Sequence, residues 1–167
     1  MKISGKFILL SFIAGALLSC NQPKNRENKE LVRAQFERWQ KDSEGFFDLL
    51  DEDAVWVVGG RSPVSGTYKG KDDFMKRAVR PITENFATPL QPELVSLTAD
   101  DTYVWLHFTA SATTAAGDLY ENSYLWKLEL ENGKIIRGFA FLDTFELATL
   151  MNESNSNAEQ TVEEPGR

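Results

Sequence analysis

The chain has 167 residues, with 25 acidic and 18 basic side chains, a formal net charge of −7 and a single cysteine. This length suffices for one domain with its own hydrophobic core. An acidic chain without a basic stripe argues against nucleic-acid binding, and one cysteine excludes an intrachain disulfide.

The N-terminus predicts an export signal. Lys2 and Lys6 precede an apolar run over residues 7–18, which is shorter than the roughly 20 apolar residues that span a bilayer. The run ends in the motif LLSC at residues 17–20, which resembles the lipobox of bacterial lipoproteins. That resemblance implies cleavage before Cys20, a lipid on its sulfur, and a membrane-anchored protein of the cell envelope. The alternative is an ordinary secretory signal that happens to carry a cysteine.

Composition divides the chain into four segments. We expect a lipoprotein signal peptide over residues 1–19 and then the lipidated Cys20 with a flexible polar tether to residue 30. One folded domain follows over residues 31–150. Residues 151–167 are rich in Asn, Ser and Glu, which predicts a disordered acidic tail.

Apolar spacing in the folded part predicts a helix, two short strands, a second helix and then a long antiparallel run of strands. A helix begins near Asn28, and Pro81 should distort or end a second helix that starts near Asp72. Asn132-Gly133 lies between two alternating segments, a strong hairpin signal. Strands are expected over residues 54–58, 66–70, 94–98, 102–113, 119–131 and 135–145. Helices gathered on one side of such a sheet define an α+β fold.

Three motifs carry a resemblance to a known family. They are GTYKG at residues 66–70, NGKII at 132–136 and FLDT at 141–144. With this order and spacing, residues 31–150 resemble the SnoaL-like branch of the nuclear transport factor two-like superfamily, which includes ketosteroid isomerase. The resemblance implies a cone-shaped, curved antiparallel sheet wrapped around the N-terminal helices, with one pocket and often a dimer through the outer sheet face. Function transfers poorly, because the fold hosts isomerases, cyclases, dehydratases, epoxide hydrolases and non-catalytic binders.

The last predicted strand carries the main catalytic candidate. Phe139, Phe141, Asp143 and Phe145 alternate onto one face, so an inward Asp143 would be desolvated and usable as a general acid or base. In the resemblance, Asp143 matches the catalytic aspartate of SnoaL-like cyclases. The alternative is a strand-end aspartate that bonds a backbone amide in a turn.

The two preceding strands supply further candidates. Tyr120, Asn122, Tyr124 and Trp126 share a face that should point inward, where hydroxyl and amide groups could orient a ligand or hold an oxyanion. The alternative is a core face whose polar tips meet water or backbone. His107, the only histidine, could assist Asp143. If the alternating partners of His107 face the pocket, however, it lies on a solvent or dimer face.

Two aromatic side chains, Trp56 and Tyr68, are expected at the mouth of the cone, with plain core packing as the alternative. No usual transition-metal ligand set, phosphate loop or dinucleotide motif is present, so we expect no cofactor. The sequence therefore predicts an envelope lipoprotein that binds a small apolar molecule, with cofactor-free isomerase, cyclase or dehydratase chemistry if it is catalytic. The alternative is a non-catalytic ligand-binding or dimeric accessory protein.

Overall fold

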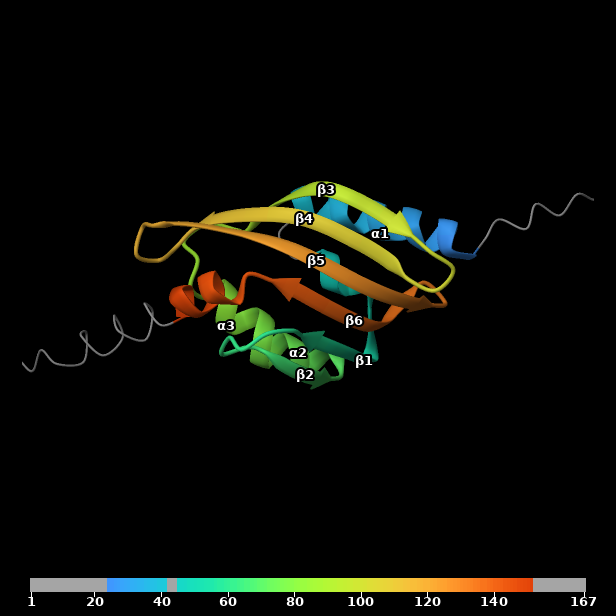
Figure 1. Ribbon diagram of the computed structural model, residues 1–167, viewed down its shortest axis with the longest axis horizontal. Helices are drawn as coiled ribbons and strands as arrows, with labels where there is room; N and C mark the ends of the chain where they lie inside the picture. The colour runs from blue at the N-terminus through green and yellow to red at the C-terminus, as the bar shows by residue number, and fades with distance from the viewer. Residues whose placement is uncertain (1–23, 42–44, 152–167) are drawn as a thin grey trace, which may run out of the picture.

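The computed structural model describes residues 24–41 and 45–151 (Figure 1). Its elements are α1 (Lys24–Lys41), η1 (Phe46–Leu49), β1 (Leu50–Val58), β2 (Gly66–Lys69), α2 (Lys71–Phe74), η2 (Met75–Val79), α3 (Arg80–Thr83), β3 (Gln91–Ala99), β4 (Val104–Thr113), β5 (Leu119–Glu131) and β6 (Lys134–Leu142). A last helix covers residues 144–151. No helix among these described residues is both long and apolar enough to cross a bilayer.

The strands form one six-stranded sheet in the order β2-β1-β6-β5-β4-β3. This confirms the expected α+β class. All neighbours pair antiparallel except β1 and β6, which run parallel. The expectation of an antiparallel sheet throughout was therefore wrong at this pair. These two strands are far apart in sequence, so no hairpin fixes their relative direction.

Local signals set the long antiparallel part of the sheet. Asn132 and Gly133 adopt φ values of 49° and 77°, the left-handed backbone that a two-residue hairpin turn requires. Side chains of β4 and β5 alternate between buried and more exposed positions along their length. The predicted hairpin and the inward-outward alternation of both strands are thus confirmed.

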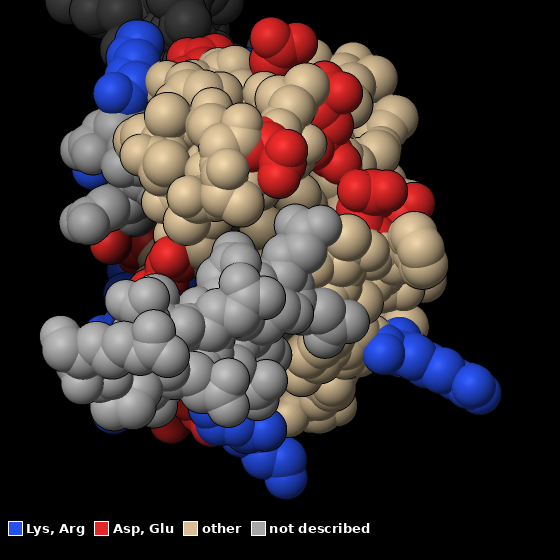
Figure 2. All heavy atoms as spheres, turned by 90° about the vertical axis from the view of Figure 1, so that its left-hand side faces the viewer, with Lys and Arg blue, Asp and Glu red and all other residues tan. Residues whose placement is uncertain are grey.

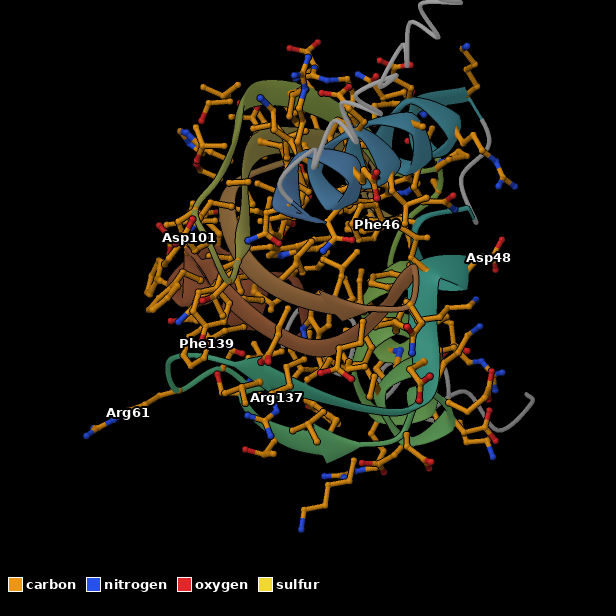
Figure 3. The ribbon with its side chains drawn as sticks, turned by 90° about the vertical axis from the view of Figure 1, so that its right-hand side faces the viewer. Phe46, Asp48, Arg61, Asp101, Arg137 and Phe139 are labelled. Atoms are coloured by element: carbon orange, nitrogen blue, oxygen red, sulfur yellow. The ribbon has the colours of Figure 1, made fainter. Side chains whose placement is uncertain are left out.

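The sheet curves around the helices (Figure 3). Pairing shifts register within β1 beside β6, within β3, and within β5 near Glu129. Such irregularities bend a strand and increase its twist. Helix α1 packs on β3 and β4, whereas α2 packs on β1 and β2. The concave face therefore holds the hydrophobic core, and Phe46 points into it between α1 and the sheet.

Helix α1 begins earlier than the sequence indicated. Residues 24–30 are helical rather than a flexible tether, while the signal peptide and Cys20 lie outside the described residues. The first turns of α1 have few apolar side chains, but they are held by polar contacts. Asn25 donates to the Asp100 carbonyl in the β3–β4 turn, and Asn28 is buried and donates to Asn25 at 3.3 Å. Hydrophobic periodicity cannot reveal such an anchor.

Pro81 distorts its helix as predicted. Residues 71–83 form one continuous helical segment whose middle, η2, is a π-helix. The Arg80 N–H donates to the Met75 carbonyl five residues back, just before the proline that lacks an N–H. The wider turn changes which side chains of the segment face the sheet.

Candidate functional site

One large cavity lies between the concave sheet face and the helices. Its volume is about 830 Å³, and it opens between the end of α1, the 71–83 segment and the loop before β3. Its wall is mostly apolar. The lining residues are Arg38, Trp39, Gly45, Phe47, Asp48, Val58, Val64, Lys71, Phe74, Met75, Ala78, Val79, Arg80, Ile82, Thr83, Phe86, Ala87, Thr88, Pro89, Leu90, Tyr124, Trp126, Leu142 and Leu147.

Aromatic rings form much of this wall. The rings of Trp39 and Trp126 stack with centroids 5.8 Å apart and planes 12° apart. The ring centroid of Phe47 lies 5.9 Å from that of Trp126 and 5.4 Å from that of Phe74. Behind them, Trp56 stacks on Phe74 at 4.8 Å. Interlocked rings hold one another in place, so this wall presents fixed flat surfaces to a ligand.

A hydrogen-bond relay joins the end of β6 to the cavity wall. The buried Asn122 accepts at Oδ1 from the Asp143 and Ser123 backbone N–H groups, at 3.0 and 2.8 Å. Its Nδ2 donates to the Asp143 carbonyl and to the Tyr120 hydroxyl, each at 2.9 Å. A flipped amide would face two N–H donors, so these partners fix its orientation. The Tyr120 hydroxyl lies 2.9 Å from that of Tyr124.

The tyrosine pair leaves one donor unused. Tyr120 accepts from Asn122, and either hydroxyl can donate to the other, so within the described residues one O–H proton of the pair has no acceptor. Tyr124 lines the cavity, and an acceptor on a ligand there would favour the arrangement in which Tyr120 donates to Tyr124 and Tyr124 donates to the ligand. Burial raises the pKa of Tyr120 and raises that of Tyr124 well above its ordinary value. Both phenols therefore stay protonated at neutral pH, and the wall carries a neutral hydrogen-bond donor.

Asp143 does not point into this cavity, so the prediction of an inward, desolvated acid was wrong. Strand β6 ends at Leu142, and Asp143 is exposed just before the last helix. Its Oδ1 accepts from the backbone N–H groups of Phe145 and Glu146, at 2.9 and 3.4 Å. It caps the helix, which is the alternative that the sequence left open.

The other members of that expected face also lie outside the cavity. Phe139 is partly buried and Phe141 is 53% exposed, with their rings 4.5 Å apart on the outer, convex sheet face. His107 is on the same outer face, 3.4 Å from the Ser123 hydroxyl, because its alternating partners Leu106 and Phe108 are fully buried. The prediction that Phe139 and Phe141 bind the ligand was therefore wrong, and so was the catalytic role predicted for His107, for which the structure shows the outer face that the sequence left open as the alternative.

The remaining candidates lie inward, in two roles. Tyr124 and Trp126 line the cavity. Trp56 is 5.2 Å from Trp126 and supports the wall from behind. Tyr68 is buried against Phe74 and donates to the Val64 carbonyl at 2.5 Å, which is a core role. Tyr120 and Asn122 act through the relay rather than through direct contact.

Sequence reasoning missed the lining residues that come from helices and loops. Phe47, Phe74 and Phe86 belong to three separate segments, and Leu147 belongs to the unpredicted last helix. One signal was present: Asp143 and Glu146 have the capping-box spacing that starts a helix. Phe47, Phe74 and Phe86 come together in one wall through long-range packing, which no local sequence pattern predicts.

A second hollow of about 460 Å³ lies where the start of β3, the end of β4 and the start of β5 meet. Four exposed acids, Glu93, Glu121, Asp143 and Glu146, belong to its wall, and Figure 2 shows acidic side chains over this end of the molecule. No group of three or more His, Cys, Asp or Glu side chains in the described ranges is arranged to hold a metal ion.

Comparisons with known proteins agree with this geometry. The profile of the SnoaL-like domain matches residues 32–138. Among solved structures, Bal32a from a soil-derived mobile gene cassette is 22% identical, with a TM-score of 0.64 over 76% of this chain and 98% of Bal32a. An NTF2-like protein from Anabaena variabilis ATCC 29413 is 19% identical, with a TM-score of 0.60 over 75% and 94%.

A third structure, described as a SnoaL-like polyketide cyclase from Jannaschia sp. CCS1, is 15% identical, with a TM-score of 0.61 over 77% of this chain and 94% of that one. Comparison with curated proteins gives no match. At these identities the solved structures show a shared fold.

Proposed function

The chain belongs to the SnoaL-like domain family, and from that premise we propose that its cavity binds a small, largely apolar molecule that carries a hydrogen-bond acceptor. A volume of about 830 Å³ is ample for such a molecule, and the mostly apolar wall favours one. The single observation that carries the proposal is the buried hydroxyl pair of Tyr120 and Tyr124 at the cavity wall, which leaves one O–H proton for an acceptor on a ligand at Tyr124.

Recognition rather than turnover is the function that these residues support best. A carbonyl placed at Tyr124 would be polarised by a buried donor, which is the requirement for stabilising an enolate oxygen. Proton transfer beside that carbonyl also needs a base, and Asp143 and His107 both lie outside the cavity. Asp48 is the carboxylate among the described lining residues, and it is exposed.

Two fluorescent naphthalene probes test the proposal on the wild-type chain. The ketone 6-propionyl-2-dimethylaminonaphthalene carries an acceptor, whereas N-phenyl-1-naphthylamine has no carbonyl. We expect both probes to bind. Tyr124→Phe should weaken binding of the ketone by about fivefold, the cost of one hydrogen bond, and should leave binding of the amine unchanged. Titration by probe fluorescence measures both affinities.

Tyr103→Phe is the matched control, because it removes the hydroxyl of a tyrosine whose ring meets Trp105 edge to face outside the cavity. It should leave both affinities unchanged. The proposal is wrong if neither probe binds the wild type, or if Tyr124→Phe weakens both probes equally.

We also propose that the domain works at a membrane of the bacterial cell envelope, anchored through lipid on Cys20. The support is the N-terminal sequence, which lies outside the described residues. Helix α1 begins four residues after Cys20, so such a lipid would hold the domain close to the bilayer surface. A ligand of low solubility in water would be concentrated there.

A dimer through the outer sheet face is a second candidate property. Phe141 is 53% exposed and Leu125 is 37% exposed, and the two are paired across β5 and β6. Phe139 packs on Phe141 beside them. Exposed apolar groups gathered on one face of a sheet are typical of protein contact sites. This observation supports a second copy of the chain as the partner.

A further inference from the structure

The proposed cavity carries charges of one sign at its opening. Arg38 at the end of α1 and Arg80 at the start of α3 are exposed and also line the cavity, which places them at its rim. Lys71 adds a third cation, and Asp48 is the one described anion of the wall. The rim is therefore predominantly positive, although the whole chain carries a net charge of −7.

Ion pairing separates these cations from others on the same helical segment. Lys76 lies 3.6 Å from Asp72 and Arg77 lies 3.0 Å from Asp73, one turn earlier. Arg80 has no ion pair within the described residues. The side of the segment away from the cavity is thus neutralised locally, while its cavity side keeps a free guanidinium.

The other rim cations are also weakly engaged. Arg38 donates to the neutral Gln35 Oε1 at 3.3 Å and forms no ion pair with a described carboxylate. Lys71 lies 3.9 Å from the Glu52 carboxylate, which is 83% exposed and so is largely hydrated. An anion at the opening could therefore pair with a rim guanidinium group without displacing a buried partner.

We propose that the ligand is an aromatic acid, with its anionic group at the Arg38 and Arg80 rim and its apolar body inside. The inference rests on the proposed function, because it assigns a substrate class to the same cavity. Stacked indole and phenyl rings favour a flat body. Guanidinium groups pair well with carboxylate oxygens, and a ligand that covers the opening excludes water and strengthens that pairing.

The test compares two probes with one ring system. The anionic probe is 1-anilinonaphthalene-8-sulfonate, and the neutral probe is N-phenyl-1-naphthylamine, which lacks the sulfonate. We expect the double variant Arg38→Gln/Arg80→Gln to bind the anionic probe about tenfold more weakly than the wild type. Its affinity for the neutral probe should be unchanged. Added salt should weaken the anionic probe alone, and the two probes should compete.

The control is Arg61→Gln/Arg137→Gln, which removes the same charge. Arg61 reaches away from the body of the molecule and Arg137 lies on the strand β6, outside the cavity wall (Figure 3). This variant should leave both affinities unchanged. Equal loss of the anionic probe in both double variants, or no loss in either, overturns the inference while the cavity proposal stands. Failure of both probes to bind the wild type removes the cavity proposal itself.

Discussion

Asp143 shows how a single residue takes its role from the element that follows it. Its carboxylate accepts two backbone N–H groups at the start of the 144–151 helix, which also places Leu147 and Leu150 in the core. We expect Asp143→Ala to lower the free energy of unfolding by about 1 kcal/mol, the usual value of such a cap. Binding of N-phenyl-1-naphthylamine should be unchanged. Urea denaturation and probe titration measure the two quantities.

Asp143→Asn is the informative companion, because an amide oxygen also caps a helix and should retain most of that stability. A large loss of stability in Asp143→Asn would contradict the capping role, and loss of probe binding at wild-type stability would contradict the placement of Asp143 outside the cavity. The sequence contained the signal for this cap, Asp143 with Glu146 three residues later. It was obscured because the same stretch also alternates Phe139, Phe141 and Phe145 at strand spacing.

At the scale of elements, Gly138 determines how closely β1 and β6 pack. It pairs with Trp56 across the parallel ladder, and a Cβ at this position would lie 2.1 Å from the Trp56 ring. Trp56 is 1% exposed and stacks on Phe74, so the ring has no free space to move into. We expect Gly138→Ala to destabilise the fold by about 3 kcal/mol through overpacking, as measured by urea denaturation.

A double variant separates this clash from a general intolerance of the strand. In a Trp56→Leu background the ring is gone, so the added methyl of Gly138→Ala should cost little and the two effects should be non-additive. Additive losses would show that the contact does not matter. The contact itself was not predictable, because the long strands and the hairpin follow from local spacing whereas the β1–β6 pairing joins residues about 80 positions apart.

The same limit applies to the cavity as a whole. Alternation on β5 correctly placed Tyr124 and Trp126 inward, since period-two patterning is local. The opposite wall comes from η1, the 71–83 segment and the loop before β3, which meet only in the folded chain. The Pro81 distortion could be predicted, but the way it turns Arg80 toward the opening depends on how that segment packs on the sheet.

At the scale of the whole molecule, the two faces of the sheet are suited to different partners. The concave face encloses the cavity, and the convex face exposes Phe141 and Leu125 with His107 beside them. A self-complementary contact of two convex faces would bury these groups by twofold symmetry. We expect the unlipidated chain to behave as a dimer in size-exclusion chromatography with light scattering, and Phe141→Asp to behave as a monomer.

Leu119→Asp is the matched control for this prediction. Leu119 is 69% exposed on β5 but lies six residues from Leu125, about 20 Å along the strand. It adds the same charge away from the patch and should leave the dimer intact. Because the cavity lies on the opposite face, Phe141→Asp should still bind N-phenyl-1-naphthylamine. If the wild type is a monomer at micromolar concentration, the outer patch does not form a dimer contact. The proposal that the concave face binds a ligand is unaffected by that result.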